Sequence, residues 1–416
     1  MKQIVKSVAV VTSIWMFVGC GGGLSDPSEN LKGGELLIDF PSSLIKPSLV
    51  AKGLIPATQT VYGYKAYKIP YTTTDEEGEK VEASGVFIIP TEKEEFKTKG
   101  LSMVSDDHGT IFANREAPTL LNSTIGKPPA SSALLLTSLG GFATLQPDYI
   151  GFGDSNDHYH PFILKKSLAN STVDFIKTVK VFASKNGIKL NNQLFLTGYS
   201  EGGYAAMATL KKIEDENLTD LTVTMAAPMA GPYALKPMSD MVLNSDTLGV
   251  PSFMANVGYA YAKAYQHDIE TVINEPYASK LPTLFNGDLN RTEIDPELTH
   301  GTKGATGLFD GNFVTNYFTD STHWFKQAVT ENSLHTWAPK APVRLVHCEG
   351  DDVIPYLIST ATKDTMIGYG ATNVAVVPVE QTLGLPIKVG HGDCGTLGYK
   401  VTTGLFAVER YKVYGY

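Results

Sequence analysis

The spacing of hydrophobic residues divides the chain into two regions. Between residues 60 and 90, apolar and polar positions alternate in two runs, 61–67 and 81–89, with the polar patch 72–78 between them. Successive side chains of a strand point to opposite faces, so this alternation predicts two half-buried strands. We expect them to form a hairpin or a short meander.

Beyond residue 100 the pattern changes to short apolar runs that alternate with helical stretches. The apolar runs have the length of buried strands and occupy residues 101–104, 141–145, 193–197, 221–226, 343–347 and 374–377. The clearest helical stretches are 171–186, 201–214 and 395–411. Buried strands that alternate with helices predict an α/β fold, with a mostly parallel central sheet and helices on both faces.

One segment, 231–340, breaks this alternation. It holds many aromatic, Met and Pro residues, and its clearest helical stretch is 253–265. We interpret this segment as an insertion that caps the carboxyl edge of the sheet.

The N-terminus has the pattern of a targeting signal. Lys2 and Lys6 precede the short apolar run 8–18, and Cys20 follows it closely. A basic start and a short apolar core predict a secretory signal over residues 1–19, and the run is too short to span a membrane comfortably. With Cys20 directly after it, the signal resembles that of bacterial lipoproteins, in which this cysteine is lipidated; an ordinary cleaved signal is the alternative. We expect an exported protein, either secreted or held at the cell surface or in the periplasm.

The chain is therefore expected to have five segments. They are a lipoprotein-type signal peptide (1–19), a flexible tether (20–40), the first part of the α/β core (41–230), a cap or lid insertion (231–340) and the second part of the core (341–416). The tether is expected because Gly, Ser, Pro and Asn dominate its first residues.

Composition narrows the partners that the protein can have. Of the 416 residues 43% are hydrophobic and 19% are charged, values typical of an ordinary globular protein, and the formal net charge is -9. Basic runs and aromatic-studded basic faces are lacking in the sequence, which argues against nucleic acid as a partner. The His and Cys residues show no ligand spacing, so we expect neither a metal nor another cofactor.

The strongest chemical signal is the sequence Gly-Tyr-Ser-Glu-Gly-Gly over residues 198–203. It matches G-x-S-x-G and lies between an expected strand and an expected helix, the context of a nucleophile turn. The backbone on the two sides of such a serine is crowded, so only residues without a Cβ fit at Gly198 and Gly202. We predict that Ser200 is a nucleophile. A glycine-rich turn with an incidental serine is the alternative.

A serine nucleophile needs a base, and the base needs an anion that holds its tautomer. In this fold the three residues follow one another in the order Ser, Asp or Glu, His. An acidic loop follows the strand 343–347. Asp351 is favoured there because its run, Asp-x-Val-Ile-Pro, resembles the hydrolase pattern in which the acid precedes a short apolar stretch and a proline; Asp352 is the second candidate and Glu349 the third. His391 is predicted to be the base because it lies on a glycine-flanked loop between the last strand and the last helix.

Besides Cys20 the chain has two cysteines, Cys348 and Cys394, which stand three residues before Asp351 and three residues after His391. In an oxidising compartment we expect them to form one disulfide, which would tie the acid loop to the base loop. Two buried free thiols are the alternative.

An oxyanion hole needs two backbone amides. The first is expected from Glu201, directly after the nucleophile. The second is expected from Thr110, in the His-Gly-Thr sequence that follows the strand 101–104. A plain glycine turn is the alternative for this second segment.

Taken in order, these motifs resemble those of the secretory lipases and their bacterial esterase relatives in the α/β-hydrolase superfamily. The segments that carry the resemblance are 108–110, 148–155, 160–161, 198–203, 351–355 and 391–392. The resemblance implies hydrolysis of carboxylic esters or acylglycerols under a lid inserted before the acid strand. The segment 231–340 fits that lid, and its aromatic and Met residues either line an acyl pocket or form a small core.

We therefore predict an exported serine hydrolase that cleaves small-molecule or lipid esters through an acyl-enzyme on Ser200. One alternative is a serine peptidase or amidase that uses the same triad. Another is a surface-tethered binding module on a hydrolase scaffold. Contact with a membrane is expected only through the N-terminal lipid anchor.

Overall fold

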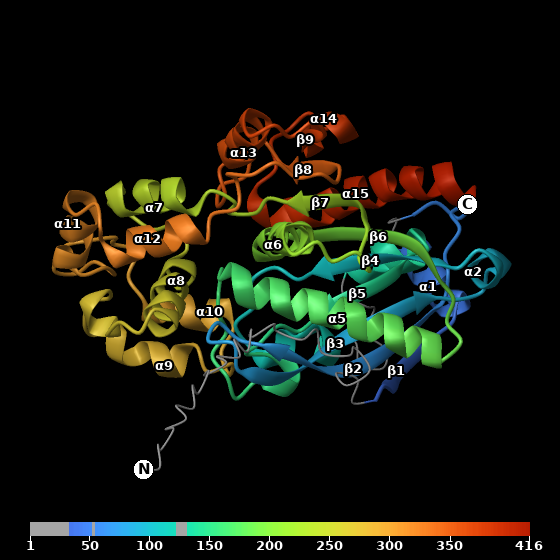
Figure 1. Ribbon diagram of the computed structural model, residues 1–416, viewed down its shortest axis with the longest axis horizontal. Helices are drawn as coiled ribbons and strands as arrows, with labels where there is room; N and C mark the ends of the chain where they lie inside the picture. Colours follow the sequence, from blue (N-terminus) through green and yellow to red (C-terminus); the bar gives the residue numbers. More distant parts are fainter. Residues whose placement is uncertain (1–32, 52–54, 122–130) are drawn as a thin grey trace, which may run out of the picture.

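The computed structural model describes residues 33–51, 55–121 and 131–416. Its centre is a nine-stranded sheet with the order β1-β2-β3-β5-β4-β6-β7-β8-β9 (Figure 1). The strands are β1 Glu35–Phe40, β2 Tyr64–Thr74, β3 Lys80–Pro90, β4 Leu101–Asp107, β5 Ala143–Pro147, β6 Leu190–Tyr199, β7 Val223–Met229, β8 Val343–His347 and β9 Val374–Pro378. Neighbours from β5 to β9 pair in parallel, whereas β1, β2, β3 and β5 pair antiparallel. The prediction of a mostly parallel sheet is confirmed.

The N-terminal edge of the sheet contains the expected hairpin. Strands β2 and β3 pair along their whole length, from Tyr64 opposite Pro90 to Thr74 opposite Lys80. Strand β1 adds to β2, although its residues fall within the segment predicted as a tether. The expected tether over 20–40 is therefore wrong at its C-terminal end, because residues 35–40 include a short apolar run that pairs with β2 as an edge strand. The predicted signal 1–19 and Cys20 lie outside the described residues.

Helices cover both faces of the sheet, as predicted. Their bounds are α1 Ser42–Ala51, α2 Glu94–Thr98, α3 Pro118–Leu121, α4 Ser131–Ala133, α5 Lys165–Lys185, α6 Glu201–Asp215, α13 Tyr356–Gly368, α14 Val379–Leu383 and α15 His391–Tyr414. Helices α5 and α6 pack on the face to which Leu194 and Leu196 of β6 point. Phe195 points the other way and contacts Phe406 of α15. Both faces of β6 are therefore buried against helices, as is required of a central parallel strand.

The segment 231–340 contains helices and turns but no strand longer than an isolated bridge. Its helices are α7 Leu235–Asn244, α8 Pro251–Ala264, α9 Leu281–Leu284, α10 Arg291–Ile294, α11 Gly311–Thr319 and α12 Trp324–Glu331. They gather beyond the end of the sheet at which β6 meets α6, on the left of Figure 1. The expected helix over 253–265 corresponds to α8.

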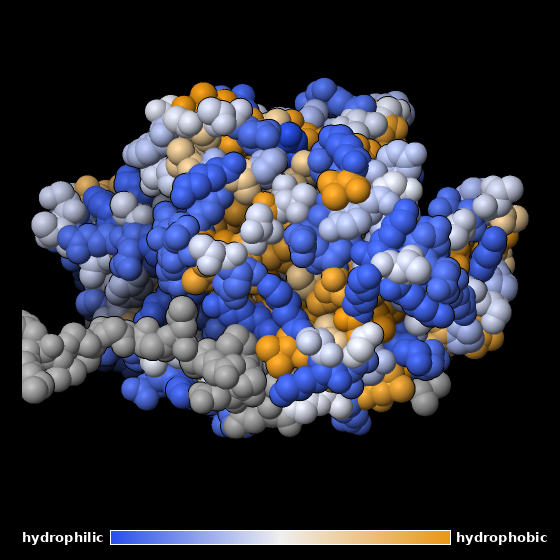
Figure 2. Space-filling model, turned by 45° about the vertical axis from the view of Figure 1, so that its right-hand side comes forward, coloured by the Kyte–Doolittle hydropathy of each residue, from blue (hydrophilic) through white to orange (hydrophobic). Residues whose placement is uncertain are grey.

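The surface is mostly polar. On the face shown in Figure 2, hydrophilic residues predominate and apolar side chains appear in patches between them. A search of the described part of the chain finds no helix that is long and apolar enough to cross a membrane.

The contact between Phe406 and Phe195 should hold α15 to the sheet. Phe406 is fully buried, and its ring centroid lies 4.5 Å from that of Phe195. We expect Phe406→Ala to lower the free energy of unfolding by about 3–5 kcal/mol, because it leaves a cavity in the core. Val408→Ala, on the same helix but 55% exposed, should change it by less than about 0.5 kcal/mol. Urea denaturation measures both, and equal effects would contradict this packing.

Candidate active site

Ser200 lies on a strained turn between β6 and α6. Its φ and ψ are 60° and −119°, a conformation that side chains rarely adopt. A Cβ on Gly202 would lie 1.8 Å from the carbonyl oxygen of Asp107, and one on Gly198 would lie 2.4 Å from the same atom. The turn thus presses on the end of β4, and glycine is required at both flanking positions, as the sequence predicts.

Three side chains from distant parts of the chain form one hydrogen-bonded row. His391 Nε2 lies 3.0 Å from Ser200 Oγ, and His391 Nδ1 lies 2.7 Å from Asp351 Oδ2. An ionised carboxylate can only accept, so Nδ1 carries the ring proton and the Nε2 lone pair faces the hydroxyl. In this arrangement the imidazole can take the hydroxyl proton while the carboxylate supports the resulting charge.

Asp351 is held by more than its contact with His391. Its Oδ1 accepts hydrogen bonds from the backbone amides of Val353 (2.9 Å) and Ile354 (2.8 Å). Its Oδ2 lies 3.2 Å from Nε2 of the fully buried His347. Burial alone would raise the pKa of Asp351, but the hydrogen bonds from His347, His391 and the amides outweigh it and hold the pKa well below its ordinary value. The carboxyl group is therefore ionised at neutral pH.

The other two acid candidates are differently placed. Asp352 is exposed, and its Oδ1 accepts a hydrogen bond from the backbone N–H of His391 at 2.9 Å. Glu349 forms an ion pair of 2.8 Å with Lys388. Neither carboxylate contacts the imidazole, whereas Asp351 does.

His391 stands where the loop after α14 meets α15 and is the first residue of that helix, so the expectation that the last helix starts at residue 395 is wrong by one turn. The glycine before it, Gly390, is the N-cap, and the helix begins directly with the imidazole-bearing residue. Tyr199 Oη donates a hydrogen bond of 2.7 Å to the carbonyl oxygen of His391, and the two rings pack at 4.9 Å. Asp352 and Tyr199 together fix the backbone of His391 on both sides.

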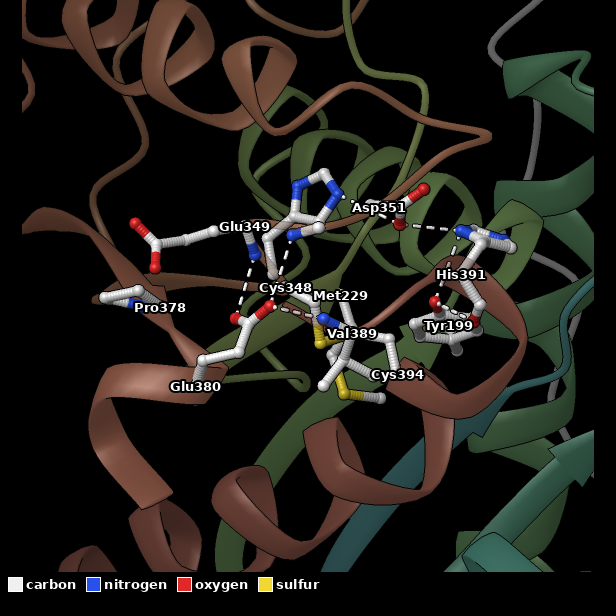
Figure 3. Close-up of a disulfide and its surroundings, with 12 residues drawn as sticks. Tyr199, Met229, Cys348, Glu349, Asp351, Pro378, Glu380, Val389, His391 and Cys394 are labelled. Carbon is white, nitrogen blue, oxygen red and sulfur yellow. Dashed lines mark hydrogen bonds and ion pairs between the residues drawn. A yellow bond between two sulfur atoms is a disulfide. The ribbon is translucent and has the colours of Figure 1, made fainter. Parts of the chain in front are cut away.

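The loops that carry Asp351 and His391 are joined by a disulfide. Cys348 and Cys394 are bonded, with their Cα atoms 6.0 Å apart, as the sequence predicts (Figure 3). Beside this bond lies Glu380, whose carboxylate accepts hydrogen bonds from backbone amides of both loops.

The two expected amide donors lie beside Ser200. Glu201 is the first residue of α6, so its N–H has no acceptor one turn earlier in the helix. Within the described chain, no hydrogen bond from the Thr110 amide is formed. A Cβ on Gly109 would lie 2.8 Å from the carbonyl oxygen of Tyr199, so this loop packs directly on the nucleophile turn.

The side chain of Glu201 points into the protein and not into solvent. Its Oε1 lies 2.8 Å from His160 Nε2, and both side chains are almost completely buried. His160 Nδ1 in turn lies 2.8 Å from the carbonyl oxygen of Ile150. This pair anchors the first residue of α6 to the loop after β5.

Ser200 separates two cavities of different character. The first, of about 130 Å³, is bounded by Ser200, Glu201 and Thr110 and is otherwise almost entirely apolar. Most of its apolar lining comes from the segment 231–340, namely Leu235, Met238, Val242, Leu243, Phe253, Met254, Val257, Tyr261, Phe309, Phe325 and Val329. The second is an open groove of about 620 Å³, which reaches from Ser200 and His391 to polar residues such as Gln146, Asn290 and Thr396.

Sequence reasoning missed several residues of this site. His347 was not among the predicted site residues; its position at the end of a strand, four residues before Asp351, is the signal that could have linked it to the acid. Nothing in the sequence marks Glu380, because its partners are backbone amides. In the part of the chain that the structure describes, there is no group of three or more His, Cys, Asp or Glu side chains that could hold a metal ion.

Comparison with solved structures gives relatives over most of the chain. A provisionally assigned hydrolase from Legionella pneumophila is 21% identical, with a TM-score of 0.77 over 92% of this chain and 99% of the other. The rice cell wall degrading esterase LipA from Xanthomonas oryzae is 22% identical, with a TM-score of 0.74 over 92% and 97%. Candida antarctica lipase A in its closed state is 16% identical, with a TM-score of 0.59 over 87% and 77%. These relatives share the α/β-hydrolase fold.

Sequence comparison identifies the family. None of the curated proteins matches the chain. The family described as secretory lipase matches residues 130–384, which is more than half of the chain. The matched range includes the nucleophile turn, the helical segment and the acid loop. The chain therefore belongs to the secretory lipase family, and it is a carboxylic ester hydrolase of the α/β-hydrolase fold.

Proposed function

We propose that the protein is an exported serine hydrolase that cleaves carboxylic esters through an acyl-enzyme on Ser200. The observation that carries the proposal is the hydrogen-bonded row from Ser200 through His391 to Asp351, which opens on an apolar cavity. Export rests on the signal pattern of residues 1–19, with Cys20 as the residue to be lipidated. The segment 231–340 acts as a cap that shapes the acyl site.

The reaction runs in two halves. His391 takes the proton of Ser200 as its oxygen attacks the ester carbonyl, and the amides of Glu201 and Thr110 donate to the oxyanion. The tetrahedral intermediate collapses, and His391 gives its proton to the departing alcohol. Water then attacks the acyl-enzyme with His391 as the base again, which releases the acid and restores Ser200. Asp351 stays ionised throughout and supports the positive charge on the imidazole.

Removing the hydroxyl of Ser200 tests the proposal as a whole. We expect Ser200→Ala to lower kcat for p-nitrophenyl butyrate by roughly 10⁴-fold or more, because no acyl-enzyme can form. A fluorophosphonate should label the wild type at Ser200, as read by mass spectrometry of the tryptic peptide. Undiminished hydrolysis by the variant, or absence of labelling, would contradict the mechanism. A parallel series with p-nitroanilides measures amide cleavage.

The two neighbouring aspartates should differ sharply. Asp351→Asn is expected to lower kcat by about 10³–10⁴-fold, because an amide cannot hold the required tautomer and charge of His391. Asp352→Asn should cost less than about tenfold, since an Asn oxygen can still accept from the His391 amide. Steady-state kinetics of both variants decides between them, and the reverse order would make Asp352 the acid.

The apolar cavity is assigned to the acyl chain, because it opens at Ser200 and its walls are almost entirely apolar. We expect Val242→Trp, which fills the cavity, to lower kcat/KM for p-nitrophenyl octanoate at least about tenfold relative to p-nitrophenyl acetate. Met241→Trp is the matched control: it stands next to Val242 on α7 but is 49% exposed. An unchanged octanoate-to-acetate ratio in Val242→Trp would exclude this cavity as the acyl site.

A further inference from the structure

Several contacts join the loop that carries Asp351 to the segment that carries His391. Besides the bond from Asp352 to the His391 amide and the ion pair of Glu349 with Lys388, two of them are buried. The first is the disulfide between Cys348 and Cys394. The second is the carboxylate of Glu380, on the short helix α14 (Figure 3). Glu380 Oε2 accepts from the amide of Glu349 at 2.8 Å. Its Oε1 accepts from the amides of Gly350 (3.1 Å) and Val389 (3.0 Å).

The two ties lie on opposite sides of the imidazole along the chain. Val389 stands two residues before His391, and Cys394 stands three residues after it. On the acid side, Glu349 and Gly350 directly precede Asp351. Two buried links at different points restrain both the separation and the angle of the two segments more than one of them does.

The chemistry of Glu380 fits a positional role. Its side chain is only 3% exposed, so an ionised carboxylate there must be compensated by hydrogen bonds. Burial would raise the pKa of Glu380, but the amides of Glu349, Val389 and Gly350 and its own amide outweigh this and lower it. The titratable groups around it are Glu349, which pairs with Lys388, and Tyr356. No Lys or Arg side chain pairs with Glu380 within the described residues.

We propose that Glu380 is a positioning residue that holds Asp351 and His391 in register, in parallel with the disulfide. This inference rests on the proposed function, since it concerns the geometry of the same three residues. Because the carboxylate needs no oxidant, it keeps the two loops aligned while the cysteines are still reduced. The disulfide then adds a covalent restraint to a site that is already assembled.

A double-mutant cycle on the full chain tests the proposal. It compares wild type, Glu380→Gln, the variant with Cys348→Ser and Cys394→Ser, and the variant with all three changes. Gln keeps the size of Glu but turns one acceptor into a donor that faces backbone amides. When only one of the two ties is removed, we expect kcat for p-nitrophenyl butyrate to fall about 3–10-fold from the wild-type value, with KM within about twofold. With both removed, kcat should fall at least about tenfold below the product of the two separate losses.

Glu409→Gln is the matched control for the charge change. Glu409 lies on α15 and pairs with Lys412 at the surface, so kcat should stay within about twofold of wild type. If Glu380→Gln does not fold, Glu380→Asp replaces it in the same cycle: the carboxylate remains but its reach is shortened by one carbon. The proposal is overturned if the loss of kcat in the combined variant equals the product of the two separate losses, or if the losses appear in KM instead of kcat.

The pH dependence of Tm gives a second measurement, and a side chain that contributes only packing would not change it. The pKa of Glu380 is lower in the folded protein than its ordinary value of 4.5, so its stabilisation is complete above that value. It is lost as pH falls from 4.5 through the folded pKa. The difference in Tm between wild type and Glu380→Gln should therefore be largest near pH 7 and shrink below pH 4.5; a constant difference overturns the assignment.

Failure of this inference is distinguishable from failure of the proposed function. If Ser200→Ala abolishes hydrolysis but the cycle is multiplicative, Glu380 is only a structural residue and the mechanism stands. If Ser200→Ala retains full activity, the proposed function fails, and the Tm readout still reports whether Glu380 joins the two loops.

Discussion

The arrangement of the site depends on one close approach, that of the nucleophile turn to the end of β4. The carbonyl oxygen of Asp107 lies where the Cβ of any residue other than glycine at position 202 would be. This approach sets the positive φ of Ser200, starts α6 directly after it, and brings the loop with Thr110 against the same turn. The strain is local, and the sheet supports it because β6 pairs in parallel with β4 on one side and β7 on the other. The proposed nucleophile and the proposed amide donors are thus fixed by backbone contacts alone.

The acid and the base depend on a different kind of constraint. They follow β8 and β9, at the edge of the sheet, and their backbones meet closely at one point, where a Cβ on Gly350 would lie 2.7 Å from the amide nitrogen of Val389. Side chains also act on backbone: Tyr199 and Asp352 hold His391, and Glu380 holds both loops. The covalent bond between Cys348 and Cys394 lies in the same place. Side-chain and covalent restraints thus add to the one close backbone contact between the two segments.

This difference explains how far the sequence could be interpreted. The turn formed by Gly198, Ser200 and Gly202 could be predicted from the sequence, because the steric constraint on it is local and requires glycines at a fixed spacing. The chain order of Asp351 and His391 follows from the fold. The choice between Asp351 and Asp352 depends on which of the two adjacent carboxylates points toward the imidazole, and the sequence does not give that direction. Glu380 could not be predicted, since any acidic residue on a short helix looks alike until the loops it binds are placed. The end of the tether was misjudged because β1 is an edge strand, whose pattern is short and weak.

Catalysis and substrate choice are drawn from different parts of the chain. The proposed machinery comes from the ends of β4, β6, β8 and β9, whereas most of the apolar cavity wall comes from α7, α8 and α12 in the segment 231–340. A side chain such as Met238 or Val257 contacts the cavity without contacting the hydrogen-bonded row. Under the proposed function, changes at these two side chains should alter the binding of an acyl group without removing any of the hydrogen bonds that hold His391. The open groove, which Ser200 and His391 also line, would then remain for the alcohol under the proposed function.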